Sequence, residues 1–166
     1  MWYAVGCYIG VEEALERELE ATGARVYLPR FRTDIQNGHS KKWRVVEQLL
    51  FRGYMFLDRE VDLRELRHGG EAWIMRTSRG DAIPVNRGQL ADLMTRQALG
   101  KFNIIVQRGS GHGPLAVVLP RVGTRVRVLA LNLLGKVIRI TNRYAEVALD
   151  GLRQKVLVVA AGLVPV

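Results

Sequence analysis

The sequence has little that could cross-link the chain or carry out catalysis. It contains one cysteine, Cys7, and three histidines, so an internal disulfide is excluded and no spacing typical of a metal site is present. The glycine-rich turn at Gly109–Gly113 is followed by Pro114 and a β-type run, whereas a nucleotide-binding turn requires a helix there. No nucleophile is recognisably paired with a base. We therefore predict a protein that is not an enzyme and needs no metal or cofactor.

Long hydrophobic runs are also missing. No apolar stretch approaches the roughly 20 residues that a membrane-spanning helix needs, and Met1–Val5 is strand-like rather than a secretory signal. Hydrophobic residues make up 48% of the sequence and charged residues 25%, which is typical of a soluble globular protein. This composition predicts a cytoplasmic protein that does not contact a membrane.

Acidic residues are scarce in the second part of the chain. Residues 1–99 contain 15 Lys and Arg against 14 Asp and Glu, whereas residues 100–166 contain 10 against 2. The two parts therefore carry +1 and +8 of the formal net charge of +9. Such an excess of cations favours a polyanionic partner, because lysine and arginine displace counterions from phosphates.

Residues 1–99 have the pattern of an α+β domain, in which helices flank an antiparallel sheet. Apolar residues from Val11 to Leu19 follow helical spacing, and glutamates such as Glu12 are expected on the opposite, wet face. Two β-type runs on either side of Phe51–Gly53 are expected to pair with each other. The expected strands are 2–8, 26–28, 43–50, 54–57 and 73–75, and the expected helices are 11–22, 62–67 and one capped by Asn86.

The composition changes after residue 99. Glycine and proline gather in residues 100–120, which we interpret as an interdomain linker. Residues 121–166 then contain short β-type runs separated by turns, and so many strands in so few residues predict a small SH3-like barrel. The strands are expected at 125–129, 136–140, 144–149 and 154–159.

The run Leu50–Leu57, LFRGYMFL, is the most specific motif in the chain. Together with Trp2–Val5 and Val26–Pro29 it resembles the N-terminal (NGN) domain of the NusG family of transcription factors. The tail resembles the KOW domain of the same family, with Gly135 at its characteristic glycine. In the tail, apolar Leu129–Leu134 replaces a Gly-Pro-Phe-containing loop, and this change favours a specialised, RfaH-like member.

The resemblance implies a factor that binds the clamp helices of the largest RNA polymerase subunit and promotes processive elongation or antitermination. Tyr54 and Phe56 lie two residues apart on a strand and therefore share a face, which suits an exposed aromatic interface. Tyr8 is expected to extend this patch, while Met55 and Leu57 face the core. We expect a monomer whose C-terminal domain contacts Rho or a ribosomal protein.

Basic side chains suggest a second kind of contact, with DNA or nascent RNA, although a merely solvated surface is the alternative interpretation. In the first domain the candidates are Arg30, Arg32, Lys41, Lys42, Arg44, Arg76 and Arg79. In the tail they are Arg125, Arg127, Lys136, Arg139 and Arg143. Because barrels of the KOW type also occur elsewhere, an RNA-binding protein of ribosome assembly or translation is the competing hypothesis.

Overall fold

The computed structural model covers residues 1–166 and describes most of them. The residues outside the description are 41, 78, 104–119, 129–132, 142–143, 151–154 and 160–162. Lys41, Arg143, the apolar run at 129–132 and most of the expected linker therefore lie outside the described residues. Within the described part of the chain, neither helix has the length and apolar character needed to cross a membrane.

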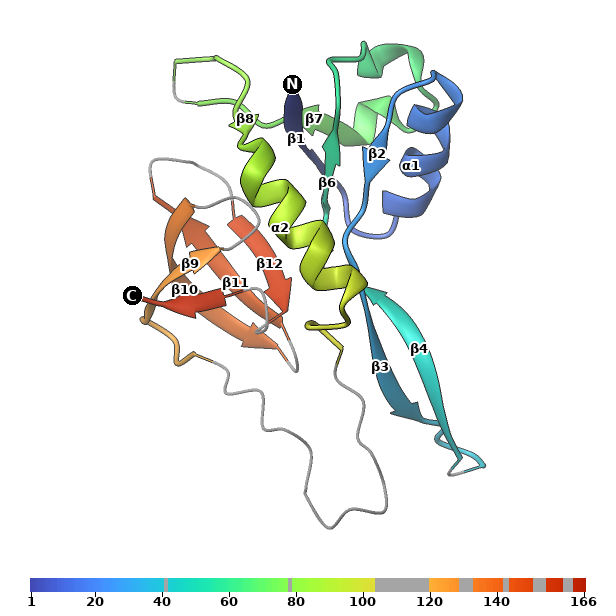
Figure 1. Ribbon diagram of the computed structural model, residues 1–166, viewed down its shortest axis with the longest axis vertical. Helices are drawn as coiled ribbons and strands as arrows, with labels where there is room; N and C mark the ends of the chain where they lie inside the picture. The colour runs from blue at the N-terminus through green and yellow to red at the C-terminus, as the bar shows by residue number, and fades with distance from the viewer. Residues whose placement is uncertain are drawn as a thin grey trace.

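An antiparallel sheet forms the N-terminal part of the molecule (Figure 1). Its central strand is β1 (Trp2–Cys7), which lies between β6 (Tyr54–Leu57) and β7 (Ala72–Ile74). The short strand β2 (Val26–Tyr27) pairs with β6, and β8 (Pro84–Val85) pairs with the first residues of β1. This part of the chain thus combines an antiparallel sheet with helices.

Two α-helices pack against this sheet on different sides. The helix α1 (Glu12–Ala21) buries Leu15 and Leu19, in agreement with the helical spacing of the sequence. Asn86 caps α2 (Arg87–Ala98) by accepting hydrogen bonds from two backbone amides of its first turn. The short helix expected at 62–67 forms as the 3-10 helix η1 (Leu63–Glu65), and a second 3-10 helix, η2 (Gly69–Glu71), follows it.

A two-stranded hairpin projects from the N-terminal sheet (Figure 1). It consists of β3 (Arg30–Gln36) and β4 (Trp43–Leu49), paired from Arg30↔Leu49 to Gln36↔Trp43. The expected pairing of the run 43–50 with 54–57 is therefore wrong. After the hairpin, Phe51–Arg52 forms the short strand β5. This strand pairs with a strand near the C-terminus.

The C-terminal strands form one curled antiparallel sheet, here called the C-terminal sheet. Its strands are β9 (Arg125–Val128), β10 (Leu133–Thr141), β11 (Tyr144–Leu149), β12 (Lys155–Val159) and β13 (Leu163–Pro165). The order is β13-β9-β10-β11-β12-β5, so that β5 from the N-terminal part completes the sheet. The alternation in β9 is confirmed, since its two valines are buried and its two arginines are exposed.

Gly135 on β10 is needed for close approach between strands. A Cβ atom at this position would lie 2.5 Å from the carbonyl oxygen of Ala148 on the neighbouring β11. That distance is shorter than real Cβ contacts, so a larger side chain would push β10 and β11 apart.

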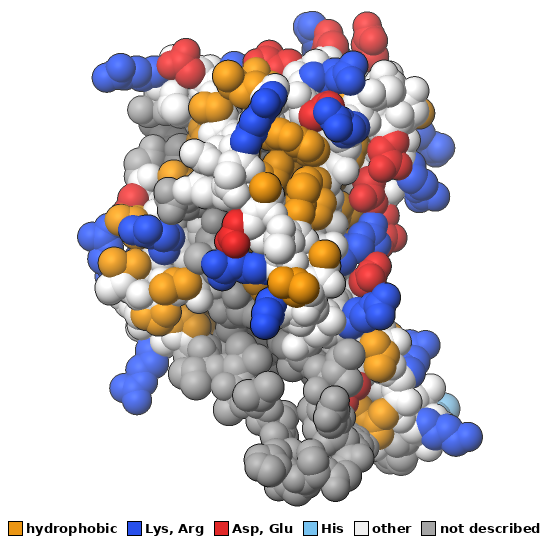
Figure 2. Space-filling view, in the orientation of Figure 1, with side chains coloured by type: hydrophobic (Ala, Val, Ile, Leu, Met, Phe, Trp, Pro, Cys, Tyr) orange, Lys and Arg blue, Asp and Glu red, His pale blue; other side chains and the backbone are white. Residues whose placement is uncertain are grey.

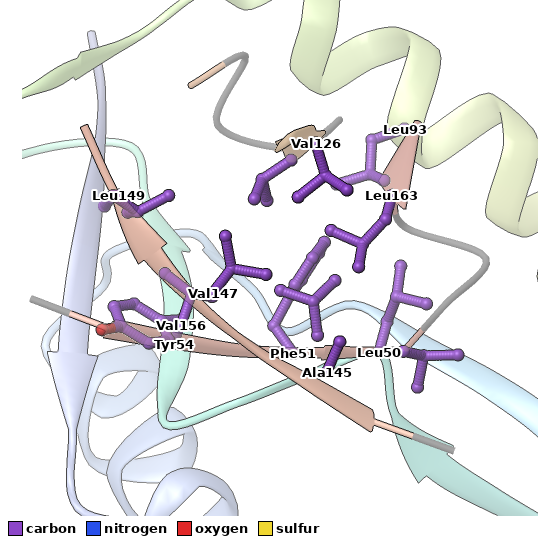
Figure 3. Packing of buried hydrophobic residues seen from close by; sticks show 14 of the residues in the cluster. Leu50, Phe51, Tyr54, Leu93, Val126, Ala145, Val147, Leu149, Val156 and Leu163 are labelled. Carbon is purple, nitrogen blue, oxygen red and sulfur yellow. The ribbon is translucent and has the colours of Figure 1, made fainter. Parts of the chain in front are cut away.

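The hydrophobic core has two parts, one on each face of the N-terminal sheet. The cluster below α1 contains Val5, Leu15 and Met55. The other cluster is shared between the N-terminal sheet, α2 and the C-terminal sheet, with residues such as Leu93 and Val126 (Figure 3). Phe102, just after α2, is buried in this shared cluster, so the beginning of the expected linker packs against the folded chain.

Candidate functional site

The motif Leu50–Leu57 contains a sharp turn between two strands that belong to different sheets. Gly53 makes this turn with φ +75°, a left-handed conformation that favours glycine. Its Cβ position would also lie 2.8 Å from the carbonyl oxygen of Cys7, because Gly53 and Cys7 approach each other closely. The Cys7 amide donates to the Gly53 carbonyl at 2.8 Å. The turn is therefore fastened to the end of β1.

Glu12 provides a second attachment for the same turn. Glu12 is only 3% exposed, and its carboxylate accepts hydrogen bonds from the backbone amides of Gly10 (2.6 Å) and Gly53 (2.9 Å). Glu12 was expected on the wet face of the helix, and this expectation is wrong because the side chain is buried. Helical periodicity could not reveal this role, because the partner amide lies 41 residues away in the sequence.

Tyr54 and Phe56 are not exposed, contrary to the expectation from their spacing. Tyr54 is 7% exposed and Phe56 1% exposed. They do share one face of β6, as expected, but the shared cluster of the N-terminal and C-terminal sheets covers that face. Met55 and Leu57 lie on the opposite face against α1 and are fully buried, as expected. Both faces of β6 are thus covered.

The cover over Tyr54 comes from strand β12. The Tyr54 hydroxyl donates to the Lys155 carbonyl at 2.6 Å, and burial raises the pKa of Tyr54 to about 12. Figure 3 shows the Tyr54 ring beside Val156, next to the other buried side chains of the C-terminal sheet. Phe56 lies deeper, stacked on Tyr27 with ring centroids 6.1 Å apart.

Backbone pairing extends the contact between the two sheets. In β5 and β12, Leu157 pairs with Arg52 and Val158 with Phe51. The Val159 amide donates to the Leu50 carbonyl at 3.1 Å. These bonds join segments about a hundred residues apart, and together with the apolar cluster they hold the C-terminal sheet against the motif.

A side-chain bond lies at the rim of the same contact. The Tyr144 hydroxyl donates to the Leu49 carbonyl at 2.8 Å, and the Arg52 guanidinium lies over the Tyr144 ring, 5.9 Å from its centroid. Polar groups thus border the buried apolar contact, as they border many interfaces between proteins.

Tyr8 remains at the surface, next to the covered residues. It is 61% exposed, and the following Ile9 is 54% exposed. The Tyr8 ring meets Trp73 edge to face, with centroids 5.9 Å apart. The Trp73 indole packs on Gly6 of β1. A Cβ atom at position 6 would lie 2.5 Å from the indole nitrogen. Trp73 was not among the site residues expected from the sequence, because nothing local shows that Gly6 makes room for it.

The basic residues predicted to contact nucleic acid fall into two groups. Arg30 is partly buried and forms ion pairs with Glu16 (2.6 Å) and Glu13 (3.2 Å) of α1, with Glu47 at 3.8 Å. Arg30 therefore links the hairpin to α1. These carboxylates largely neutralise its charge, which makes Arg30 a poor ligand for a phosphate. Lys42 and Arg44 are exposed on the hairpin.

The other predicted cations differ in their surroundings. Arg76 donates to the Gly80 carbonyl at 2.9 Å, and Arg125 forms an ion pair with Asp150. The remaining candidates are exposed, namely Arg32, Arg79, Arg127, Lys136 and Arg139. Figure 2 shows basic side chains spread over several parts of one face, with acidic side chains gathered over α1. The described candidates thus lie on separate elements, on the hairpin, after β7 and on the C-terminal sheet.

Metal chemistry finds no support in the part of the chain that the structure describes. That part contains no group of three or more His, Cys, Asp or Glu side chains placed to hold a metal ion. Cys7 is buried, and burial raises the pKa of its thiol to about 12. The thiol is thus kept in its unreactive, protonated form.

The first part of the chain matches a known protein family. Residues 1–79 match the model of the NusG family, described as transcription termination factor nusG. No curated protein matches the chain. The matched segment contains β1, α1, the hairpin and the whole Leu50–Leu57 motif. The N-terminal part of the chain therefore has the sequence pattern of the NusG family, a family of transcription elongation factors.

Two solved structures align with nearly the whole chain, at low identity and low TM-score. The structure titled "Domain interaction in Thermotoga maritima NusG" is 19% identical, covers 98% of this chain and 94% of its own, and has a TM-score of 0.38. One structure of the MjSpt4:Spt5 complex is 14% identical, covers 100% of this chain and 98% of its own, and has a TM-score of 0.28.

Proposed function

We propose that this chain is a transcription elongation and antitermination factor of the NusG family that binds the clamp helices of the largest RNA polymerase subunit. One observation supports the location of the binding surface. Exposed Tyr8 lies at the edge of a face of the N-terminal sheet that continues into Tyr54 and Phe56. Aromatic side chains are the commonest anchors of protein interfaces. The proposed binding surface consists of these three residues.

Two of the three anchors are covered in this structure, so the proposal includes two arrangements of the chain. In the docked arrangement described above, β12 and its neighbours cover Tyr54 and Phe56. In the undocked arrangement, the C-terminal sheet leaves and polymerase takes its place. A partner that binds only the undocked arrangement shifts the equilibrium towards it by its differential affinity. Polymerase would thus first meet Tyr8 and then displace the C-terminal sheet.

The domain boundaries follow from this proposal. Residues 1–99 form the polymerase-binding domain, residues 100–120 the tether, and residues 121–166 a KOW-like barrel of the SH3 type. Once undocked, the barrel is available to Rho or a ribosomal protein. The apolar run at 129–134 and the net charge of +8 in residues 100–166 favour a specialised, RfaH-like member over a housekeeping one. The factor works as a cytoplasmic monomer.

Binding to an isolated clamp-helix fragment tests the proposal. Tyr8→Ala removes an exposed ring without disturbing the core, so we expect at least about a tenfold weaker affinity, as for a hot-spot residue. Trp43→Ala is a matched control, because Trp43 is an aromatic residue 42% exposed on the hairpin. Equal affinity of wild type and Tyr8→Ala for the fragment would contradict the proposed binding surface.

A functional assay tests the activity itself. Elongation by purified polymerase through a pause and a Rho-dependent terminator is expected to become more complete when the wild-type chain is added. Tyr8→Ala is expected to lose this effect in proportion to its affinity. A wild-type chain that binds polymerase but leaves both signals unchanged would contradict the elongation function.

The exposed cations of the C-terminal sheet favour a second candidate, an RNA-binding protein of ribosome assembly or translation. Arg127, Lys136 and Arg139 are exposed on strands β9 and β10, in the half of the chain with a net charge of +8. Affinity capture separates the two candidates. Recovery of ribosomal subunits without polymerase would support the second candidate and contradict the first.

A further inference from the structure

An open hollow lies where the two sheets meet. It is a cleft of about 570 Å³, open to solvent, bordered on one side by the end of β1 and the β5–β6 turn and on the other by β10, β11 and β12. This volume is in the range of ligand sites. Because both sheets supply its walls, the cleft exists only while they are docked.

The N-terminal wall of the cleft is aromatic and accessible. Tyr8 projects from the end of β1 with 61% of its surface exposed, and Trp73 and Ile9 lie beside it. An exposed aromatic ring offers a surface on which a planar group can stack.

The opposite wall is cationic. It contains Arg139 and Lys155 from the C-terminal sheet, and Arg52 projects from the β5 end of the cleft. Glu146 is the acidic residue of the lining, and it is engaged by Lys155 at 3.4 Å. Among the described residues, Arg52 has its cation–π contact with Tyr144, and the ion pairs of the cleft are limited to Lys155–Glu146. Three cations against one carboxylate leave an electropositive cleft.

We propose that this interdomain cleft binds a short stretch of single-stranded nucleic acid. Aromatic rings that stack bases, combined with cations that contact the phosphates between them, are the recognition chemistry of single strands. A base stacks on Tyr8, and the neighbouring phosphates contact Arg139 and Arg52. An acidic protein segment would engage the cations but would leave the aromatic wall without a planar partner.

The site has a regulatory consequence, because it consists of both sheets. A ligand that binds only the docked arrangement stabilises it. Bound nucleic acid would therefore hold the C-terminal sheet over Tyr54 and also occupy Tyr8. The nucleic acid would therefore compete with polymerase for the chain. This competition rests on the proposed function, whereas binding of nucleic acid in the cleft does not.

Fluorescence anisotropy of the full chain with a labelled oligouridylate tests the binding, without polymerase. Arg139→Gln is expected to weaken binding and to reduce the slope of log K against log salt by about 0.7, the value for one phosphate contact on a single strand. Tyr8→Ala is expected to weaken binding about tenfold through lost stacking. Arg87→Gln is the matched control, since Arg87 is exposed after β8, at the opposite end of β1 from Tyr8.

Two further arms complete the test. Oligothymidylate distinguishes RNA from DNA as the source of the single strand, and binding of either supports the site. If polyglutamate displaces the oligonucleotide equally well, and Tyr8→Ala binds as wild type, the cleft recognises anions in general and the proposal is overturned.

Amide hydrogen exchange tests the link to docking. The amides of Leu157, which pairs with Arg52 of β5, and of Val159, which donates to the Leu50 carbonyl, are expected to exchange more slowly when the oligonucleotide is bound. Unchanged or faster exchange would show that the ligand does not bridge the two sheets. Polymerase is absent from these assays, so a negative result would contradict nucleic-acid binding in the cleft but not the proposed function. A negative result in the clamp-helix assay would contradict the proposed function but not binding in the cleft.

Discussion

The two faces of strand β6 are equally buried, yet they are covered in different ways. Met55 and Leu57 pack against α1, which lies about forty residues earlier in the sequence. Tyr54 and Phe56 face a cluster completed by strands from the other end of the chain. Burial therefore does not distinguish a permanent core from a surface covered by another part of the same chain. The distinction lies in what borders each contact.

The α1 side is a closed apolar contact, whereas the β12 side has the features of an interface. On the β12 side the Tyr54 and Tyr144 hydroxyls donate to backbone carbonyls across the boundary. An open cleft also borders this contact, and an exposed aromatic ring, Tyr8, lies in the cleft. We infer that the first face is permanent core and that the second can be uncovered.

The largest effect is expected from the permanent face. Met55→Ala removes a fully buried side chain below α1 and should lower the free energy of unfolding by about 2–5 kcal/mol. Urea denaturation followed by circular dichroism measures this loss. If Met55→Ala merely released the C-terminal sheet without lowering overall stability, the distinction between the two faces would be lost.

A smaller loss is expected from Glu12→Gln. The amide side chain cannot accept both hydrogen bonds with its single oxygen, so one buried backbone donor loses its partner, at a cost of about 1–3 kcal/mol. Glu13→Gln is the control, because the Glu13 side chain is 66% exposed and should change stability by less than about 0.5 kcal/mol. Equal midpoints in thermal unfolding would contradict the proposed role of Glu12 in positioning the turn.

Tyr54→Phe should affect docking and leave the N-terminal core intact. It removes the hydroxyl that donates to the Lys155 carbonyl, a bond that contributes about 0.5–1.5 kcal/mol. We expect faster amide exchange at Leu157 and tighter binding to the clamp-helix fragment.

Tyr27→Phe serves as the comparison for Tyr54→Phe. The Tyr27 hydroxyl donates to Gln97 of α2 rather than to the C-terminal sheet. Its loss should lower stability without increasing exchange at Leu157. The same exchange pattern in both variants would show that the two sheets do not separate.

The smallest effect on stability is expected for the exposed hairpin cations. Lys42→Gln/Arg44→Gln should leave the free energy of unfolding within about 0.5 kcal/mol of wild type. If the hairpin contacts DNA, the salt slope of DNA binding should decrease by about 1.8, two phosphate contacts at about 0.9 each. Arg30→Gln, by contrast, should lower stability, because Arg30 holds α1 through two carboxylates. Filter binding and denaturation separate these outcomes.

Short-range patterns in the sequence predicted much of the fold. The spacing of Leu15 and Leu19 predicted α1, Asn86 marked the start of α2, and alternation in Arg125–Val128 predicted which side chains face inward. Each of these signals acts within a few residues, where backbone geometry decides which side chains share a face. The candidate site was less predictable, because its partners lie far apart in the chain.

The amino-acid sequence by itself determined both α-helices, most of the strands, the excess of positive charge in residues 100–166 and the family pattern of the Leu50–Leu57 motif. Only the tertiary structure decided that Tyr54 and Phe56 are covered, that Glu12 fastens a turn, and that Arg30 is neutralised by acids. The physical reason is that periodicity determines which residues share a face, whereas the partner of that face depends on contacts between distant segments. Here β12 covers a motif about a hundred residues earlier in the sequence.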